Sequence, residues 1–280
     1  MTDALRIQPM SLADLRAAVD WAAAEGWNPG IKDPETFYPV DPSGFLMGWI
    51  GDKRATAISV VAHSDDFGFL GFYLCAPEFR GKGYGFKTWQ EGLGRLGTRT
   101  VGLDGVPAQE HNYRRSGFEF AFRSHRYEGE IKGRAHGSCV PAEPTDMAAL
   151  IALDEDVNRA ARPAFVDAWV QQTDTRRTLV QRHGNRVVAM GTIRRCRVGH
   201  KIGPVIAPDA VRAGELIESL VAATGAGRVA IDIPETSDAG TSLAARFGLE
   251  TSFACARMYK GDVHNVDTER LVGLASFELG

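Results

Sequence analysis

Arginine, lysine and glycine alternate in one short stretch of this chain, and these residue types could bind an anion. Residues 80–85 read RGKGYG, so Gly81, Gly83 and Gly85 occupy every second position. Glycine allows positive φ and lets the backbone approach a ligand closely. If a helix begins here, its first amides and its dipole favour a pyrophosphate, and Arg80 and Lys82 add positive charge. A tight surface turn with basic residues for solubility explains the glycines equally well.

The spacing of the glycines distinguishes this stretch from other phosphate loops. A dinucleotide fingerprint needs G-x-G-x-x-G and an NTPase loop needs G-x-x-x-x-G-K-[ST], and neither occurs here. The stretch resembles R-x-x-G-x-G, carried by Arg80, Gly83 and Gly85, which is the acyl-CoA pyrophosphate loop of the GNAT superfamily of N-acetyltransferases. A second GNAT motif, a tyrosine four residues before Gly-Phe, occurs as YRRSGF beginning at Tyr113.

This resemblance implies where acyl-CoA would bind. The pantetheine arm would lie along the strand before the loop, and the pyrophosphate would accept hydrogen bonds from the amides after it. Acetyl-CoA is the expected co-substrate. The residues assigned to cofactor binding are Tyr73, Leu74, Cys75, Arg80, Gly81, Lys82, Gly83, Tyr84, Gly85, Phe86 and Tyr113.

The resemblance also makes Tyr113 the general acid. A phenol with an unperturbed pKa of about 10 keeps its proton at neutral pH and can deliver it to a departing thiolate. The alternative is that Tyr113 only packs beside the CoA sulfur. A backbone N–H near Leu74 or Cys75 could stabilise the oxyanion. Cys75 itself is interpreted as a small buried residue and not as a nucleophile.

The base that deprotonates the incoming ammonium is harder to assign. Asp104 follows the strand predicted over 98–103, close to the expected position of the thioester, and is the candidate catalytic base. Asp104, Glu110 and His111 could equally be capping or surface residues, and a water chain could take the place of a base.

Acceptor binding is expected from two other stretches. Residues 27–41 combine turn formers with large aromatic side chains, as functional loops often do, although a short helix capping the core is the alternative. Trp27 and Tyr38 from this stretch, and Asp154 from the LDED cluster further on, are the candidate substrate-binding residues. If the acids face a cleft, they favour a small cationic amine or polyamine. Otherwise they form a solvated helix end.

The strand before the loop is predicted to be buried on both faces. Period two places Leu70, Phe72 and Leu74 on one face of that strand. In the helix after the loop, Phe86 and Trp89 share the apolar side, so Trp89 is interpreted as a core residue.

Composition limits the classes of function. The 280 residues suffice for one large or two ordinary domains, and 24% charged with 44% hydrophobic residues are typical of a soluble globular protein. A formal net charge of −3 gives no reason to expect nucleic acid or an anionic membrane as a partner. No signal peptide, membrane span or metal site is expected, and the four scattered cysteines suggest a reducing compartment, so a cytoplasmic location is predicted.

The chain contains an internal duplication. Ala76-Pro77 matches Ala207-Pro208 at an offset of 131, and the GFE and GLE triplets that begin at Gly117 and Gly248 match at the same offset. We therefore predict a catalytic domain over 1–130, a linker over 131–144 and a second domain over 145–280. By the resemblance, each domain is an α+β fold with a mostly antiparallel twisted sheet flanked by helices.

The second copy differs from the first where the chemistry would lie. The equivalents of Arg80 and Tyr113 are Val211 and Ala244, so this copy is predicted to keep the fold without the cofactor site. The arrangement resembles bacterial tandem GNAT proteins, in which the second domain would cover the acceptor site.

These features predict an N-acyltransferase that moves an acetyl group from acetyl-CoA to a primary amine of a small molecule by direct attack. A non-catalytic acyl-CoA sensor or interaction module and a protein-lysine acetyltransferase are the alternatives. The acceptor, the acyl chain length and the oligomeric state stay open.

Overall fold

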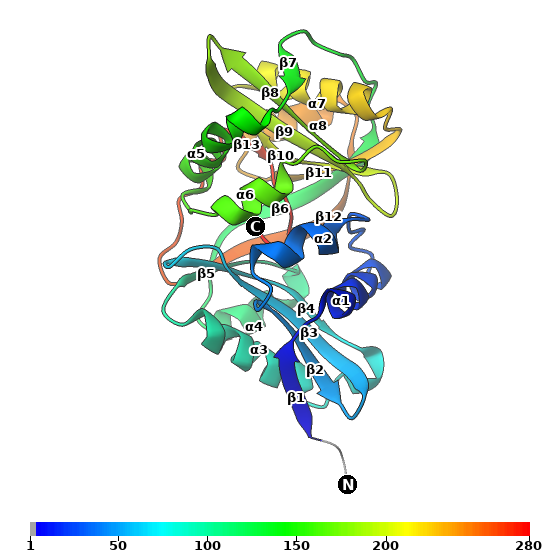
Figure 1. Cartoon of the computed structure of the whole chain (residues 1–280), viewed down its shortest axis with the longest axis vertical. Coiled ribbons are helices and arrows are strands. Elements are labelled where there is room, and N and C mark those ends of the chain that lie inside the picture. The colour runs from blue at the N-terminus through cyan, green and yellow to red at the C-terminus, as the bar shows by residue number, and fades with distance from the viewer. Residues whose placement is uncertain (1–3) are drawn as a thin grey trace.

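The computed structural model describes residues 4–280, which form two lobes stacked along the long axis with the C-terminus between them (Figure 1). The first half of the chain contains β1 (Leu5–Pro9), α1 (Leu12–Ala24), α2 (Asp33–Phe37), β2 (Phe45–Ile50), β3 (Lys53–Ala62), β4 (Phe67–Cys75), α3 (Tyr84–Leu96), β5 (Thr100–Gly105), α4 (Glu110–Arg115) and β6 (Glu119–Glu130). The second half contains β7 (Cys139–Pro141), α5 (Met147–Asn158), α6 (Pro163–Trp169), β8 (Arg176–His183), β9 (Arg186–Arg195), β10 (His200–Ile206), α7 (Ala210–Thr224), β11 (Arg228–Pro234), α8 (Asp238–Arg246), β12 (Glu250–Lys260) and β13 (Leu271–Gly273). No helix in this part of the chain is long and apolar enough to cross a bilayer.

A single twisted sheet connects the two lobes. Its strand order is β1-β2-β3-β4-β5-β12-β6-β11-β10-β9-β8-β7, and β13 pairs with β10. The β4–β5 and β10–β11 pairs are parallel and the other pairs are antiparallel. The predicted α+β class with a mostly antiparallel sheet is confirmed. The stretch expected as a linker carries β7, which pairs with β8.

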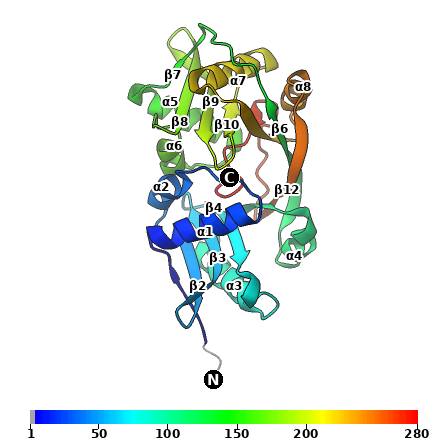
Figure 2. The ribbon, with the colours of Figure 1, turned by 90° about the vertical axis from the view of Figure 1, so that its right-hand side faces the viewer.

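The two halves exchange their last long strands. β6 and β12 are equivalent by the sequence offset, and they run side by side between the lobes (Figure 2). β6 pairs on its other edge with β11 of the second half, and β12 pairs with β5 of the first half. β6, the last strand within residues 1–130, therefore does not pair with β5. Each half takes this strand from the other.

A β-bulge interrupts β4 beside the predicted loop. Ala57 pairs with Leu74 and Ser59 with Gly71, so β4 has one more residue than β3 in this interval. Phe72 has φ +45°, a conformation that residues other than glycine rarely adopt. The extra residue reverses the alternation. Phe72 and Leu74 pack toward α1, whereas Leu70 packs toward α3, so the prediction of one shared face is wrong for Leu70.

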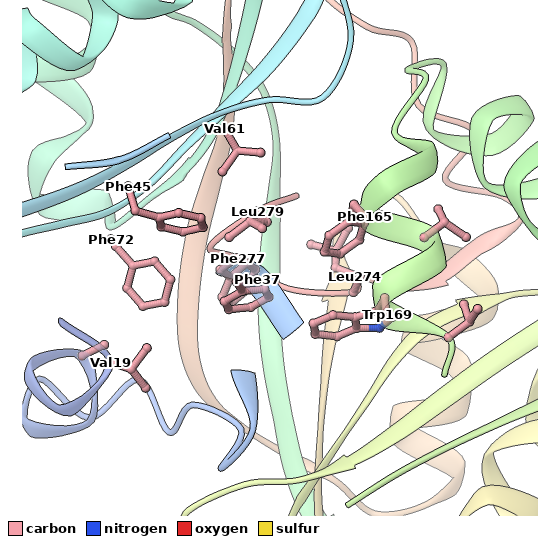
Figure 3. Close-up of a cluster of buried hydrophobic side chains, with 14 of the residues drawn as sticks. Val19, Phe37, Phe45, Val61, Phe72, Phe165, Trp169, Leu274, Phe277 and Leu279 are labelled. Carbon is pink, nitrogen blue, oxygen red and sulfur yellow. The ribbon is translucent and has the colours of Figure 1, made fainter. Parts of the chain in front are cut away.

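Apolar side chains from both lobes and from the C-terminal tail (residues 274–280) form one cluster (Figure 3). Phe37 of α2 stacks on Trp169 of α6 with ring centroids 5.8 Å apart, and Phe277 and Leu279 of the tail lie in the same cluster. The lobes thus share a core as well as a sheet.

The stretch 27–41 proves to be both loop and helix. Its first part bonds to the second half through a bridge between Gly30 and Cys196, and it then forms α2. Asp33 is buried at the start of α2, where it accepts hydrogen bonds from the Gly30 amide and from Arg176. This stretch consequently fastens the two lobes together.

Candidate active site

The strands β4 and β5 part in the middle of the sheet. Their parallel pairing covers residues 67–70 and 100–103 and then stops, while β4 continues to Cys75 and β5 to Gly105. A cavity of about 440 Å³ lies at this split. It is lined by Tyr73 and Tyr113 from the first half and by Phe253 and Phe277 from the second half. The strand exchange and the tail therefore bring the second half to the site.

A second cavity of about 610 Å³ lies between α3 and α4. Phe86 and Gln90 of α3 face Asn112 and Arg115 of α4 across it. Phe86 is 58% exposed, so the expectation that it shares the core with Trp89 is wrong, although Trp89 itself is buried as predicted. The two cavities share Tyr73, Gln109 and Tyr113 as lining residues, so these residues mark the boundary between them.

The glycine-rich loop begins α3 in the geometry that its sequence predicts. Gly81 and Gly83 have φ values of +74° and +79°, and Gly83 caps the helix. The first helical hydrogen bond runs from the Lys87 amide to the Gly83 carbonyl, so the amides of residues 84–86 have no partner within the helix. A Cβ added at Gly81 or Gly83 would meet nothing within 4 Å. The space next to these two glycines is therefore open.

The two basic side chains of the loop are both bonded nearby. Arg80 donates from Nε to the Cys75 carbonyl at 2.9 Å and forms an ion pair with Glu25. Lys82 donates to the Glu78 carbonyl at 2.7 Å. The side chains of Arg80 and Glu25 are 51% and 41% exposed, so an anion could displace this contact at small cost.

Tyr113 lies where its motif predicts, beside the end of β5. A Cβ added at Gly105 would lie 2.7 Å from Tyr113 Cδ2, so only glycine lets the ring pack this closely. The ring also stacks on Trp89 with centroids 5.5 Å apart. Burial raises the pKa of the Tyr113 phenol above its ordinary value. The hydroxyl therefore holds its proton at neutral pH.

Cys75 lines the first cavity at the end of β4. Burial raises the pKa of its thiol, so the uncharged form prevails at neutral pH. Because a thiolate is the nucleophilic form of cysteine, this environment does not activate Cys75.

Asp104 lines the same cavity, but both of its carboxylate oxygens are engaged. Arg257 of β12 donates from Nε to Oδ1 at 2.8 Å and from Nη2 to Oδ2 at 2.7 Å. The two side chains are buried. Burial raises the pKa of Asp104, although Arg257 opposes this shift. The expectation that Asp104 offers a free base is contradicted by this geometry, because Asp104 instead holds a buried guanidinium that the strand exchange places opposite it.

Trp27, a candidate substrate-binding residue, lines the first cavity. The Trp27 carbonyl accepts hydrogen bonds of 2.9 Å from Arg126 Nη1 and from Lys201 Nζ. Arg126 also forms a bidentate pair with Asp232, and its guanidinium lies 5.5 Å from the Phe253 ring centroid. Arg126 is therefore paired with Asp232, whereas the Trp27 carbonyl is the acceptor that the structure shows for Lys201.

Comparison with known proteins agrees with this geometry. The model of the acetyltransferase (GNAT) domain matches residues 150–273, which is the half predicted to have lost the cofactor site. Holothin acyltransferase of Pseudoalteromonas sp. (strain SANK 73390) is 31% identical over 278 residues, which cover 98% of this chain and 94% of that protein. The chain belongs to the GNAT superfamily. It is therefore an acyltransferase.

Solved structures share the fold over most of the chain. A Pyrococcus horikoshii protein assigned as an acetyltransferase superimposes with a TM-score of 0.82 at 19% identity, covering 99% of this chain and 96% of its own. A tandem GNAT protein from the clavulanic acid biosynthesis pathway gives a TM-score of 0.62 at 13% identity, covering 93% of this chain and all of its own. At these identities the likeness concerns the fold alone.

Two of the residues predicted to bind the acceptor, Tyr38 and Asp154, do not line the first cavity. The Tyr38 hydroxyl donates to the Met10 carbonyl at 3.1 Å, and its ring packs near Phe45. Asp154 is buried in a bidentate pair with Arg162 at 2.7 and 2.9 Å, so it is neither cleft-facing nor a solvated helix end. Because these groups already have internal partners, neither is available to an acceptor in the cavity.

Several lining residues of the cavity were not among the predicted site residues, and Phe253, Phe277 and Glu278 of the second half are the ones that matter for the acceptor side. They reach the cavity only because β12 is exchanged and because the tail folds back between the lobes. One signal was present, since Glu278 is a single acid enclosed by Phe277 and Leu279 in the last residues of the chain.

Proposed function

We propose that this GNAT protein transfers an acetyl group from acetyl-CoA to a primary amine of a small molecule by direct attack of the amine. The observation that carries the proposal is the junction of two cavities at Tyr73 and Tyr113, where β4 and β5 part. One cavity adjoins the glycine-rich helix start and the other is bordered by both lobes, so a donor and an acceptor could meet at this junction.

The residues around the loop fit acyl-CoA. The unpaired amides at the start of α3 and the open space before Gly81 and Gly83 suit a pyrophosphate, with Arg80 and Lys82 beside it. Among residues 4–280, no strand pairs with β4 on the β5 side past Leu70, so the main chain of residues 73–75 is available to pair with pantetheine. Acetyl-CoA would supply the activated acyl group at the far end of this path.

Tyr113 is the residue best placed to protonate the leaving thiolate. Its phenol is protonated, lies at the boundary of the two cavities and is fixed by Trp89 and Gly105. An amide of the β4 segment near Leu74 or Cys75 would stabilise the oxyanion. These roles require no acyl-enzyme and leave Cys75 as a lining residue.

The acceptor side supports a small molecule. The cavity of about 440 Å³ would hold the end of the pantetheine arm beside residues 73–75 and the acceptor beside Phe253 and Phe277, so the second half acts as its cover and the space left for the acceptor is small. The relative named holothin acyltransferase supports acyl transfer as the chemistry.

A thermal shift experiment tests the cofactor assignment. At about 100 times its dissociation constant, acetyl-CoA should stabilise the wild type by about 2.7 kcal/mol. Gly83→Glu should abolish this shift, because it places a carboxylate before the loop at a positive φ. Gly94→Glu, the same change at an exposed site in α3 with open space, should retain the full shift. A wild type that does not respond to acetyl-CoA contradicts the proposal.

A further inference from the structure

The tail formed by residues 274–280 is held firmly between the lobes. Ser276 Oγ accepts hydrogen bonds from the amides of Glu278 and Leu279 at 3.0 and 3.1 Å. His63 donates from Nε2 to the Leu279 carbonyl at 2.9 Å. Phe277 and Leu279 are both buried in the shared core. The backbone position of Glu278, which lies between them, is therefore fixed.

The Glu278 side chain starts directly beside the split of β4 and β5. A Cβ added at Gly71 would lie 2.8 Å from the Glu278 carbonyl carbon, so the tail lies against the β4 backbone at the bulge. Ser59 Oγ also donates to the Glu278 carbonyl at 3.4 Å. The bulge is the point at which β4 leaves β5, so Glu278 is anchored where the acyl group is expected.

Glu278 is a buried carboxylate that faces the charges of the buried cations Arg126, Arg194 and Lys201 but forms no hydrogen bond with them. It is 4% exposed and lines the first cavity. Among residues 4–280, no hydrogen bond or ion pair engages its carboxylate oxygens. Its two carboxylate oxygens are not fully enclosed, so both are accessible from the cavity.

The other ionisable groups of this cavity are engaged elsewhere. Asp104 is paired with Arg257, and Glu25 is paired with Arg80. The cavity cation Arg126 is committed to Asp232 and to the Trp27 carbonyl. A buried carboxylate costs several kcal/mol unless a cation or donor satisfies it. The charges of Arg126, Arg194 and Lys201 help to stabilise the Glu278 carboxylate, while its oxygens stay available to a hydrogen-bond donor from outside the protein, such as an ammonium group.

The remaining lining of the cavity is largely apolar and aromatic, with Trp27, Phe72, Phe253 and Phe277 among its residues. We propose that Glu278 binds the ammonium group of the acceptor and takes its proton, and that the acceptor is a small, mainly apolar primary monoamine. One carboxylate without a hydrogen-bond partner, in a cavity lined by aromatic rings, suits one charge on an apolar body, not a polyamine. This inference rests on the proposed function.

The proton balance of the reaction is complete with the residues described. The ammonium gives one proton to the Glu278 carboxylate and becomes a neutral amine. The amine nitrogen then forms a bond to the thioester carbonyl carbon, and the carbon–sulfur bond breaks. Tyr113 gives its proton to the departing thiolate and regains one from the nitrogen, which becomes an amide. Glu278 finally releases its proton to solvent.

Amine binding and turnover test this role separately. The probes are phenethylamine, as an apolar monoamine, and spermidine, as a polyamine. Binding to the CoA-loaded protein is measured by calorimetry, and turnover is measured with acetyl-CoA. Glu278→Gln removes the charge at nearly constant volume, and Glu278→Asp keeps it on a shorter side chain. The matched control is Glu269→Gln, which removes an exposed carboxylate from the same C-terminal segment.

We expect Glu278→Gln to bind phenethylamine at least about 10-fold more weakly and to lose about 100-fold in kcat/KM, as expected for removal of a general base. Glu278→Asp should recover part of both losses, and Glu269→Gln should match the wild type. Unchanged phenethylamine binding and turnover in Glu278→Gln would overturn the inference, as would a wild type that binds or acetylates spermidine in preference to phenethylamine. The acetyl-CoA thermal shift is recorded for every variant. If it is present, such a result removes only the inference, and if it is absent from the wild type the proposed function fails.

Discussion

The contact between Gly71 and the tail allows the acceptor site to be perturbed without touching the cofactor loop. In Gly71→Ala the new Cβ would lie 2.8 Å from the Glu278 carbonyl carbon and closer still to its oxygen. Ordinary contact begins at 3.4 Å, so the tail and β4 must separate by at least about 0.6 Å. Both neighbours are main chain, so a rotamer change cannot relieve the contact. The tail, with Glu278, must move.

The size of this movement sets the expected effects. Overpacking of a tight core site costs about 1–3 kcal/mol, which corresponds to a fall in Tm of roughly 2–12 °C for a chain of this size. A displacement of about 1 Å at a reacting group can reduce turnover about 100-fold. We therefore expect Gly71→Ala to lower kcat/KM for the amine by about 10-fold or more. The acetyl-CoA thermal shift should persist, because the loop before α3 is unchanged.

Calorimetric unfolding and steady-state kinetics with phenethylamine check this expectation. Gly94→Ala is the control, because it makes the same change at an exposed position of α3 where an added Cβ meets nothing within 4 Å. It should leave the kinetics unchanged and stabilise the helix by up to about 1 kcal/mol. Wild-type Tm together with wild-type amine kinetics in Gly71→Ala would refute the reasoning that the tail positions the acceptor.

Three further predictions concern single side chains. Tyr113→Phe should lower turnover by about 100-fold or more while keeping the acetyl-CoA shift, and equal turnover would remove the acid role. Burial lowers the pKa of His63 to about 3. Below pH 6.5 the imidazole is therefore protonated in the unfolded chain only, and the folded state loses stability as the pH is lowered. Between pH 7 and 5 the free energy of unfolding should fall by about 2 kcal/mol for this reason. His63→Gln, whose amide can still donate to the Leu279 carbonyl, should lose much less when urea unfolding is measured at the two pH values. An equal loss in the wild type and the variant would contradict this prediction. Arg257→Met should cost about 3–5 kcal/mol in urea unfolding, because it leaves Asp104 buried alone, and a loss below about 1 kcal/mol would show that the pair is not needed.

The local elements of the fold follow from local sequence. Ser11 and Asp14 form the capping box at the start of α1, and Gly26 follows its end with a positive φ. The turn at Gly51-Asp52 joins β2 and β3. The loop before α3 and the position of Tyr113 follow equally well, because their motifs encode turn geometry and spacing within a few residues.

The bulge in β4 escaped prediction because period two assumes an unbroken strand. The residue with the positive φ is Phe72, and phenylalanine has no preference for that conformation that the sequence could indicate. The reversal it causes decides which β4 side chains face α1, and it also provides the surface against which the tail packs.

The strand exchange escaped prediction for another reason. β6 and β12 arise from the same repeated unit, so either could complete the sheet beside β5, and local sequence does not distinguish the two pairings. The pairing used places Arg257 opposite Asp104 and so converts a predicted base into half of a buried ion pair. Tyr38 and Asp154 were predicted to bind the acceptor from their residue types. Their side chains instead form hydrogen bonds within the protein, to the Met10 carbonyl and to Arg162.

The most direct test of the central claim is a product assay. Wild-type protein is incubated with acetyl-CoA and a panel of primary amines that includes phenethylamine, and free CoA is quantified alongside mass spectrometry of the amine. We predict that CoA release matches the amount of N-acetylated amine formed, and that both depend on Tyr113 and on an intact loop at Gly83. Acetyl-CoA binding with no acetylated amine from any member of the panel would contradict the account and favour a non-catalytic acyl-CoA sensor.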